Sequence, residues 1–164
     1  MILRTETPAD AGPIAALVTA AFLGHPYSDG AEAQLVADLR RSGGLLLSLV
    51  AEEAGQLCGH IAASPARVGG QPGWAAIGPL AVLPGHQRSG IGSALMAAAL
   101  AQLQGQGWSG VVLAGDAGYY GRFGFASRPG LTAPGVPEVH VLGLAFAPHP
   151  TPCGLIGFHP AFGL

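Results

Sequence analysis

The chain has 164 residues, of which 49% are hydrophobic and 10% are charged, and its formal net charge is -2. These values predict one globular domain over residues 1–164 and exclude an intrinsically disordered chain. The basic residues are scattered arginines, which excludes a basic face for nucleic acid, and the longest apolar run is far shorter than the roughly 20 residues that cross a membrane.

The N-terminus carries no signal-peptide pattern, so we expect a soluble cytoplasmic protein. Cys58 and Cys153 lie far apart and form no C-x-x-C pair. Their spacing predicts neither a zinc site nor a disulfide framework, and we expect no metal.

Hydrophobic periodicity predicts strands and helices in the first half of the chain. Apolar residues recur at helical spacing from Ile14 to Phe22, after an N-cap signal at residues 7–10. In chain order we expect a strand at 2–6, a helix to residue 22, a helix at 31–41, and paired strands at 45–52 and 57–68.

The strand expected at 74–82 contains Gly78 and Pro79 in its middle. Proline lacks the N–H group that a central strand donates to its neighbour. We therefore expect this strand to bulge at that point, or to part from a neighbour and leave backbone groups free.

The second half of the chain shows the same alternation. Strands that alternate with helices, followed by a strand-rich C-terminal part, indicate an α/β fold with a mixed central sheet. We expect a helix at 90–104, a strand at 111–113, helical turns at 119–123, a strand at 139–146 and a last strand within 154–162.

A polar, glycine-rich turn, QRSGIG, stands directly before the helix at 90–104. The first-turn N–H groups of a helix have no partner within the helix, and its dipole favours an anion there, so a phosphate fits this position. Arg88 could add a charged contact. The other interpretation is a tight connection that binds nothing. The Rossmann and Walker patterns are both absent, since residue 95 is leucine and no Gly-Lys-Ser/Thr occurs.

Two motifs in order carry a resemblance to a known family. The segment VLPGHQRSGIG fits the pattern V-x-P-x-x-[QR]-x-x-G-x-[GA] through Val82, Pro84, Gln87, Gly90 and Gly92. Further along, YYGRFGF fits Y-x-x-x-G-F through Tyr120, Gly124 and Phe125. With these motifs the chain resembles the GCN5-related N-acetyltransferase (GNAT) superfamily, and within it the YhbS-like subgroup of small bacterial predicted acetyltransferases.

The resemblance implies a GNAT-like fold with a mixed, mostly antiparallel sheet that is splayed between its fourth and fifth strands and flanked by helices. It also implies acetyl-CoA as a co-substrate. The pantetheine arm would bind backbone groups of Leu80, Ala81 and Val82 as an added strand does. The pyrophosphate would bind the turn and the start of the helix, at Gln87, Arg88, Ser89, Gly90, Ile91, Gly92 and Ser93.

The resemblance also makes Tyr120 part of the cofactor site and the general acid that protonates the CoA thiolate. Tyr119 is its rival, because a shift of one residue exchanges the directions of the two side chains. Many relatives carry a glutamate on the fourth strand, but residues 74–83 contain no carboxylate. His60 is the alternative base by residue type, and a structural histidine is its other interpretation. Water or an already neutral amine would need no base.

We therefore expect an acyl-CoA-dependent N-acyltransferase (EC 2.3.1 type) that acts on a primary amine of a small molecule or peptide, as a monomer or homodimer. Residues 24–32, together with the C-terminal part of the chain, are expected to shape the acceptor pocket. The alternative is a non-catalytic or weakly active acyl-CoA-binding module of the same fold. A nucleotide-phosphate binder that uses only the turn is a third possibility, which the absent Rossmann and Walker patterns disfavour.

Overall fold

The computed structural model describes all 164 residues, which form two compact units. The first unit contains Met1–Ala63 and Gly78–Ala99, and the second contains Ser64–Ile77 and Leu100–Leu164. The chain passes between the units within three elements, and each of these contributes residues to both: β3 (Gln56–Val68), β4 (Gln71–Val82) and α3 (Ile91–Gly105).

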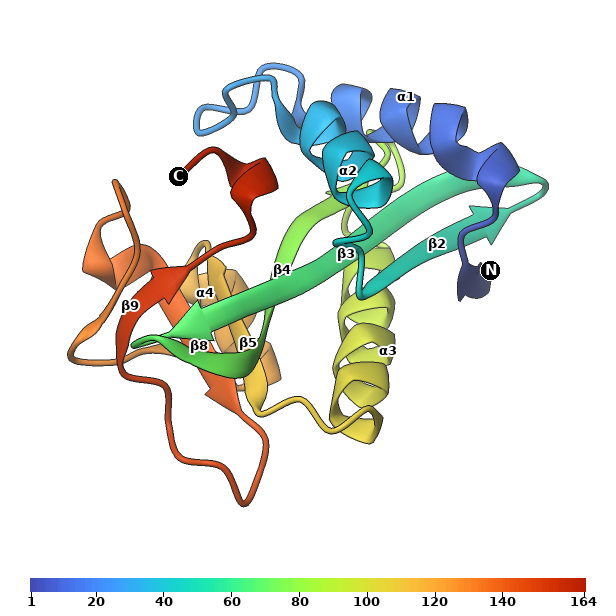
Figure 1. Cartoon of the computed structure of the whole chain (residues 1–164). Coiled ribbons are helices and arrows are strands. Elements are labelled where there is room, and N and C mark those ends of the chain that lie inside the picture. The colour runs from blue at the N-terminus through green and yellow to red at the C-terminus, as the bar shows by residue number, and fades with distance from the viewer. The chain divides into compact units, whose positions relative to one another are not determined.

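The first unit begins with a short strand and two helices that pack side by side over the strands that follow (Figure 1). A capping box formed by Thr7 and Asp10 starts a 3-10 turn at Pro8–Asp10 that runs directly into the first α-helix, at the position of the predicted N-cap signal. The elements that lie wholly in this unit are β1 (Ile2–Thr5), α1 (Ala11–Phe22), α2 (Glu32–Arg41) and β2 (Leu47–Glu53).

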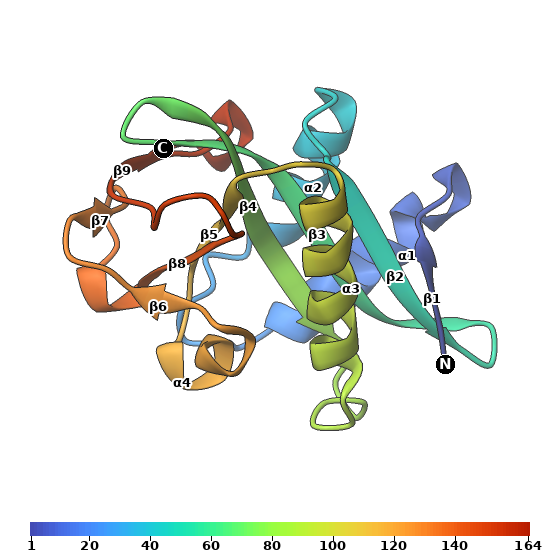
Figure 2. The ribbon, with the colours of Figure 1, turned by 90° about the horizontal axis from the view of Figure 1, so that it is seen from below.

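The two faces of this unit are covered by different helices. Ile14, Val18 and Val36 from α1 and α2 pack with Val50 of β2 and Ala81 of β4. On the other face, a Cβ atom added to Gly59 of β3 would lie 2.7 Å from Ile91 Cγ2 and 2.8 Å from Leu95 Cδ1, so α3 packs directly on the backbone there. Figure 2 shows α3 in front of β3 with α1 and α2 behind it.

The second unit is rich in strands and has its own apolar core around Trp74, Val112, Leu131 and Ile156. Its helix α4 is a single turn that packs against β6, as Figure 2 shows. Its own elements are β5 (Gly110–Ala114), α4 (Ala117–Tyr120), β6 (Ala126–Ser127), β7 (Leu131–Thr132), β8 (Val141–Ala145) and β9 (Gly154–Gly157).

Hydrogen bonds order the strands β1-β2-β3-β4-β5-β8-β6, with β9 paired to β3 and β7 paired to β9. The β4–β5 and β7–β9 pairs are parallel, and β1–β2, β2–β3, β3–β9, β5–β8 and β6–β8 are antiparallel. This confirms the predicted α/β class with a mixed, mostly antiparallel sheet. None of the helices has the length and apolar character that crossing a membrane requires.

The irregularity predicted in the fourth strand is present at Gly78. The parallel pairing joins Trp74–Ala76 of β4 to Gly110–Val112 of β5, and β4 then continues through Gly78 and Pro79 to Val82. The φ angle of Gly78 is 154°, which a residue with a side chain rarely adopts. The strand therefore passes this point through a glycine that permits the unusual backbone.

Two parts of the C-terminal region differ from the sequence prediction. β6 and β7 were not expected, because two-residue strands are too short to show a period of two. The last strand ends at Gly157, and residues Pro160–Phe162 form a 3-10 turn capped by the side chain of His159.

Candidate active site

The glycine-rich turn presents free backbone N–H groups at the start of α3. The amide of Ala94 donates the first helical hydrogen bond, to the carbonyl of Gly90 at 3.0 Å. The amides of Ile91, Gly92 and Ser93 precede it and have no carbonyl acceptor within the helix. Together with the helix dipole, they form a site suited to an anion.

The backbone of the turn adds to this site. Arg88 has a φ of 63° and Gly90 a φ of 87°, so left-handed residues stand on both sides of Ser89 directly before the helix. Turns that contain left-handed residues can direct successive N–H groups into one concavity, which binds an anion. A left-handed arginine is uncommon, since the side chain crowds the backbone in that conformation. The backbone conformation of the turn is therefore compatible with an anion bound by N–H groups.

Side chains of the turn maintain this shape. Gln87 Nε2 donates to the carbonyl of Val82 at 3.2 Å, and Ser89 Oγ donates to the carbonyl of His86. His86 in turn donates its amide to Leu83 at 2.9 Å. Gln87, Arg88, Ser89 and Gly90 are all exposed. Ser89, one of the residues predicted to contact the pyrophosphate, thus has its hydroxyl bonded within the loop in this structure.

The strand residues predicted to bind pantetheine divide between two faces. Ala81 is 1% exposed and packs with the apolar side chains of α1 and α2. Side chains alternate along a strand, so Leu80 and Val82 point to the other face, where both are half-buried. The amide of Leu83, directly after them, donates to the carbonyl of Cys58 at 2.8 Å and anchors the strand end.

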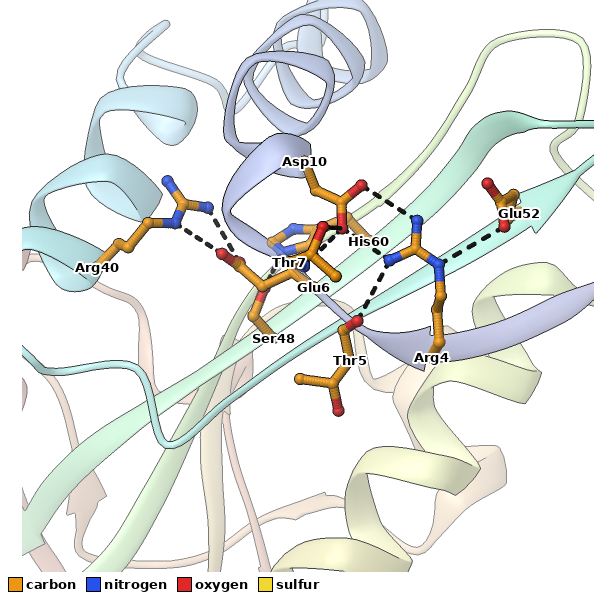
Figure 3. Close-up of polar contacts among 9 residues, drawn as sticks. All are labelled: Arg4, Thr5, Glu6, Thr7, Asp10, Arg40, Ser48, Glu52 and His60. Atoms are coloured by element: carbon orange, nitrogen blue, oxygen red, sulfur yellow. Dashed lines mark hydrogen bonds and ion pairs between the residues drawn. The ribbon is translucent and has the colours of Figure 1, made fainter.

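His60 belongs to a buried polar network in the first unit (Figure 3). Its Nε2 atom lies 2.8 Å from Ser48 Oγ, and the Ser48 hydroxyl donates to Glu6. Arg40 of α2 donates to both Glu6 oxygens, at 2.7 and 3.0 Å. A hydroxyl has one hydrogen, and Ser48 gives it to Glu6, so His60 must donate from Nε2.

The other ring nitrogen of His60 is buried and has no hydrogen-bond partner. A second proton would have to bind there without an acceptor. Burial is the main cause that lowers the pKa of His60 to about 4; the Arg40 charge lowers it further, and the Glu6 charge opposes both. His60 is therefore neutral at pH 7.

His60 also lies on the face of β3 that is opposite to the anion site. It pairs with Val50 of β2, which packs with α1 and α2. Its neighbour Gly59 faces Ile91 and Leu95 of α3. No sequence signal links His60 to its partners Glu6, Ser48 and Arg40, because they come from separate elements.

Tyr119 and Tyr120 lie in the second unit, in and around α4. Their rings meet edge to face, with centroids 4.9 Å apart. The Tyr120 ring also contacts the buried ring of Phe125, at 6.1 Å. Burial is the larger of two causes, with Tyr119 the smaller, that raise the pKa of Tyr120 to about 12. Tyr119 instead packs against Phe123 and beneath the Arg122 guanidinium, which is 4.6 Å from its ring centroid.

Asp116 begins α4 as its N-cap. Its side chain accepts a hydrogen bond from the Gly118 amide at 3.2 Å, and its carbonyl accepts from the amides of Tyr119 and Tyr120. Asp116 therefore caps the helix, a role for which aspartate is among the preferred residues. The cap sets the direction in which the two tyrosines leave the backbone.

A pocket of about 320 Å³ lies at the connection between α1 and α2 in the first unit. Phe22 and His25 line it, together with Ser28 and Glu32. Ser28 Oγ donates to Glu32 at 2.6 Å, which leaves the second carboxylate oxygen free of the serine. The pocket overlaps residues 24–32, the segment that the sequence predicts as part of the acceptor site.

Residues 14–125 match the family model described as the Acetyltransferase (GNAT) family. The matched segment contains both the anion site before α3 and the tyrosines of α4. The chain therefore belongs to the GNAT acetyltransferase family. This confirms the family resemblance that the two sequence motifs indicate.

Relatives of known structure share this fold over nearly the whole chain. A GNAT family acetyltransferase from Brucella melitensis, solved in complex with acetyl-CoA, is 44% identical, with a TM-score of 0.86 and coverage of 98% of this chain and 97% of that one. YhbS from Escherichia coli, solved in complex with CoA, is 33% identical, with a TM-score of 0.86 and coverage of 99% and 92%. By sequence, the N-acetyltransferase YhbS of strain K12 is 40% identical over 127 residues, 76% of this chain and 73% of YhbS.

Proposed function

We propose that this protein transfers an acetyl group from acetyl-CoA to a primary amine of a small molecule or peptide. The observation that carries the proposal is the run of N–H groups without a helical acceptor at the start of α3, directly after the left-handed Arg88 and Gly90. A pyrophosphate fits such a site by charge and by hydrogen bonding. The acetyl-CoA and CoA complexes of the two relatives support this ligand.

Tyr120 is the proposed general acid. Its raised pKa of about 12 keeps the phenol protonated at neutral pH. As the amine nitrogen bonds to the thioester carbon and the carbon–sulfur bond breaks, Tyr120 gives its proton to the departing sulfur. The attacking nitrogen loses its own proton to water. Tyr119 is the less suited of the two, since its ring is turned toward Arg122 and Phe123.

The amine is proposed to react without a carboxylate base on β4. Residues 74–83 contain no acid. His60 is neutral, but its low pKa makes it a weak base, and its Nε2 proton is already donated to Ser48. These features favour a structural role for His60 and deprotonation of the amine by water. The Glu32 carboxylate in the α1–α2 pocket is a candidate group to bind the acceptor's ammonium before that step.

A direct test measures binding and turnover separately. Acetyl-CoA should raise the melting temperature of the protein, and thiol release should appear with at least one member of a panel of primary amines. Failure of acetyl-CoA to raise the melting temperature would contradict the whole proposal.

The second candidate is an acyl-CoA-binding module with weak or no turnover. The specific observation in its favour is the missing carboxylate on β4. The same two measurements separate the candidates, because this module would bind acetyl-CoA but release no thiol with any amine.

A further inference from the structure

Gly115, the residue directly after β5, lies against the ring of Tyr120. Its amide donates to the carbonyl of His140 at 2.9 Å, which holds its backbone beside the end of the sheet. A Cβ atom built on Gly115 would lie 2.4 Å from Tyr120 Cε2 and 2.8 Å from Cδ2. Carbon atoms in contact normally lie about 3.5–4.0 Å apart, so no side chain fits while the ring stays in place.

The Tyr120 ring has little freedom to move away. Tyr119 packs edge to face on it, and Phe125, which is 3% exposed, packs on it as well. At its base, the Tyr120 amide donates to the carbonyl of the N-cap Asp116 at 2.9 Å. Two aromatic rings and its own helical turn thus confine the Tyr120 ring. On the remaining side, the ring lies in the space that a side chain at Gly115 would occupy.

We propose that Gly115 is a positioning residue: its missing side chain sets where the Tyr120 hydroxyl lies. This inference rests on the proposed function of Tyr120 as the general acid. Any side chain at position 115 would displace the ring by about 1 Å or more to restore normal contact, and the hydroxyl is bonded to the carbon next to Cε2. A misplacement of about 1 Å in a reacting group can cost about 100-fold in rate.

Gly121 offers a matched control in the same segment. The φ angle of Gly121 is -57°, which alanine adopts readily, and beyond its chain neighbours Tyr120 and Arg122 an added Cβ would meet nothing within 4 Å. Gly121→Ala therefore adds the same methyl group six residues away, where it does not fill a space occupied by another part of the fold. Gly115→Ala differs from Gly121→Ala mainly in the contact with the Tyr120 ring, because the next atom near the added Cβ is Leu113 Cδ1, at 3.3 Å.

The kinetic test compares four variants of the full chain with acetyl-CoA and a reactive amine. Gly115→Ala should lower kcat by about 10-fold to 100-fold with the KM for acetyl-CoA nearly unchanged, while Gly121→Ala should keep wild-type values. Gly115→Ala combined with Tyr120→Phe should be no slower than Tyr120→Phe alone, because the displaced group has already been removed. Full turnover of Gly115→Ala, or additive losses in the double variant, would overturn the inference.

A second readout does not depend on catalysis. Ultraviolet titration of the phenols, with Tyr120→Phe used to assign the signal, should report a lower pKa for Tyr120 in Gly115→Ala, because the displaced ring is less buried. An unchanged titration would overturn the inference. If Tyr120→Phe itself keeps full turnover, the general-acid proposal fails, and the titration still decides whether Gly115 places the ring.

A further comparison covers the case in which Gly115→Ala does not fold. In a Tyr120→Ala background the ring is absent and only Leu113 Cδ1, at 3.3 Å from the added Cβ, has to move slightly, so adding Gly115→Ala should lower the melting temperature far less than it does in the wild type. An equal loss of melting temperature in the two backgrounds would mean that Gly115 is required for another reason, and the inference would be wrong.

Discussion

The Nε2 atom of His60 donates a hydrogen bond to Ser48 Oγ at 2.8 Å. The Ser48 hydroxyl in turn donates to Glu6, which forms an ion pair with Arg40. These contacts link β2, β3 and α2 to Glu6, the residue directly after β1, within the first unit, as Figure 3 shows. It accounts for a histidine and a serine buried in an otherwise apolar layer. The network makes two predictions about stability.

The first prediction concerns how the free energy of unfolding depends on pH. The pKa of His60 is lowered to about 4 in the folded protein from 6.5. Between these pH values the unfolded chain binds a proton that the folded chain does not, so the free energy of unfolding falls as the pH falls. The slope is about 1.4 kcal/mol per pH unit, and the loss by pH 4 is on the order of 3 kcal/mol.

Urea unfolding measured from pH 7 to pH 4 tests this. His60→Gln keeps a donor for Ser48 but does not titrate, so its pH dependence should be shallower than that of the wild type. His149→Gln replaces an exposed histidine and should leave the slope unchanged. Equal slopes for His60→Gln and the wild type would contradict the assignment.

The second concerns the ion pair. Glu6→Ala should destabilise the fold by about 2 kcal/mol, since it leaves Arg40 and Ser48 without their half-buried acceptor. Asp38→Ala is the control: it removes an ion pair to Arg41, whose side chain is 74% exposed, and should cost less than about 1 kcal/mol. The midpoints of urea unfolding of the two variants test whether Glu6→Ala is the more destabilising. Similar losses of stability in both variants would refute the prediction.

If the turn binds the pyrophosphate, a negative charge placed in it should weaken CoA binding without unfolding the protein. Gly90→Asp should abolish binding of CoA, because its carboxylate repels the pyrophosphate. Gly90→Asn has nearly the same shape without the charge, and should lose far less affinity. Both residues tolerate the left-handed φ of 87°, so both variants should fold. Calorimetric titration with CoA is the measurement, and equal affinities for the two variants would remove the anion site from the proposal.

The proposed acid predicts a loss of turnover at constant affinity. Tyr120→Phe should lower kcat by about 100-fold with little change in acetyl-CoA binding, because the ring and its packing remain. Tyr119→Phe is the matched control and should retain most of the activity. Steady-state thiol release distinguishes them, and the reverse order would assign the acid to Tyr119.

Local signals in the sequence were enough to predict most of the elements and the position of the turn that we propose as the anion site. The capping residues Thr7 and Asp10, the turn before Ile91 and the helical spacing of apolar residues each act over a few neighbouring positions. The same holds for Gly78 and Pro79, whose effect on β4 follows from their own backbone chemistry. The two motifs added the family, which the comparisons confirm.

Only the tertiary structure decided what surrounds each of those residues. Strand alternation puts His60 and Gly59 on opposite faces, but it does not say which face α3 covers. The network partners of His60 lie 12 to 54 positions away in the sequence. The Tyr120 ring, which fills the space beside Gly115, belongs to the short helix that Asp116 caps. The physical reason is that burial, pKa and close contact depend on residues brought together by folding. By itself the sequence determined which groups the protein carries, and the fold decided which of them are neutral, enclosed or open to a ligand.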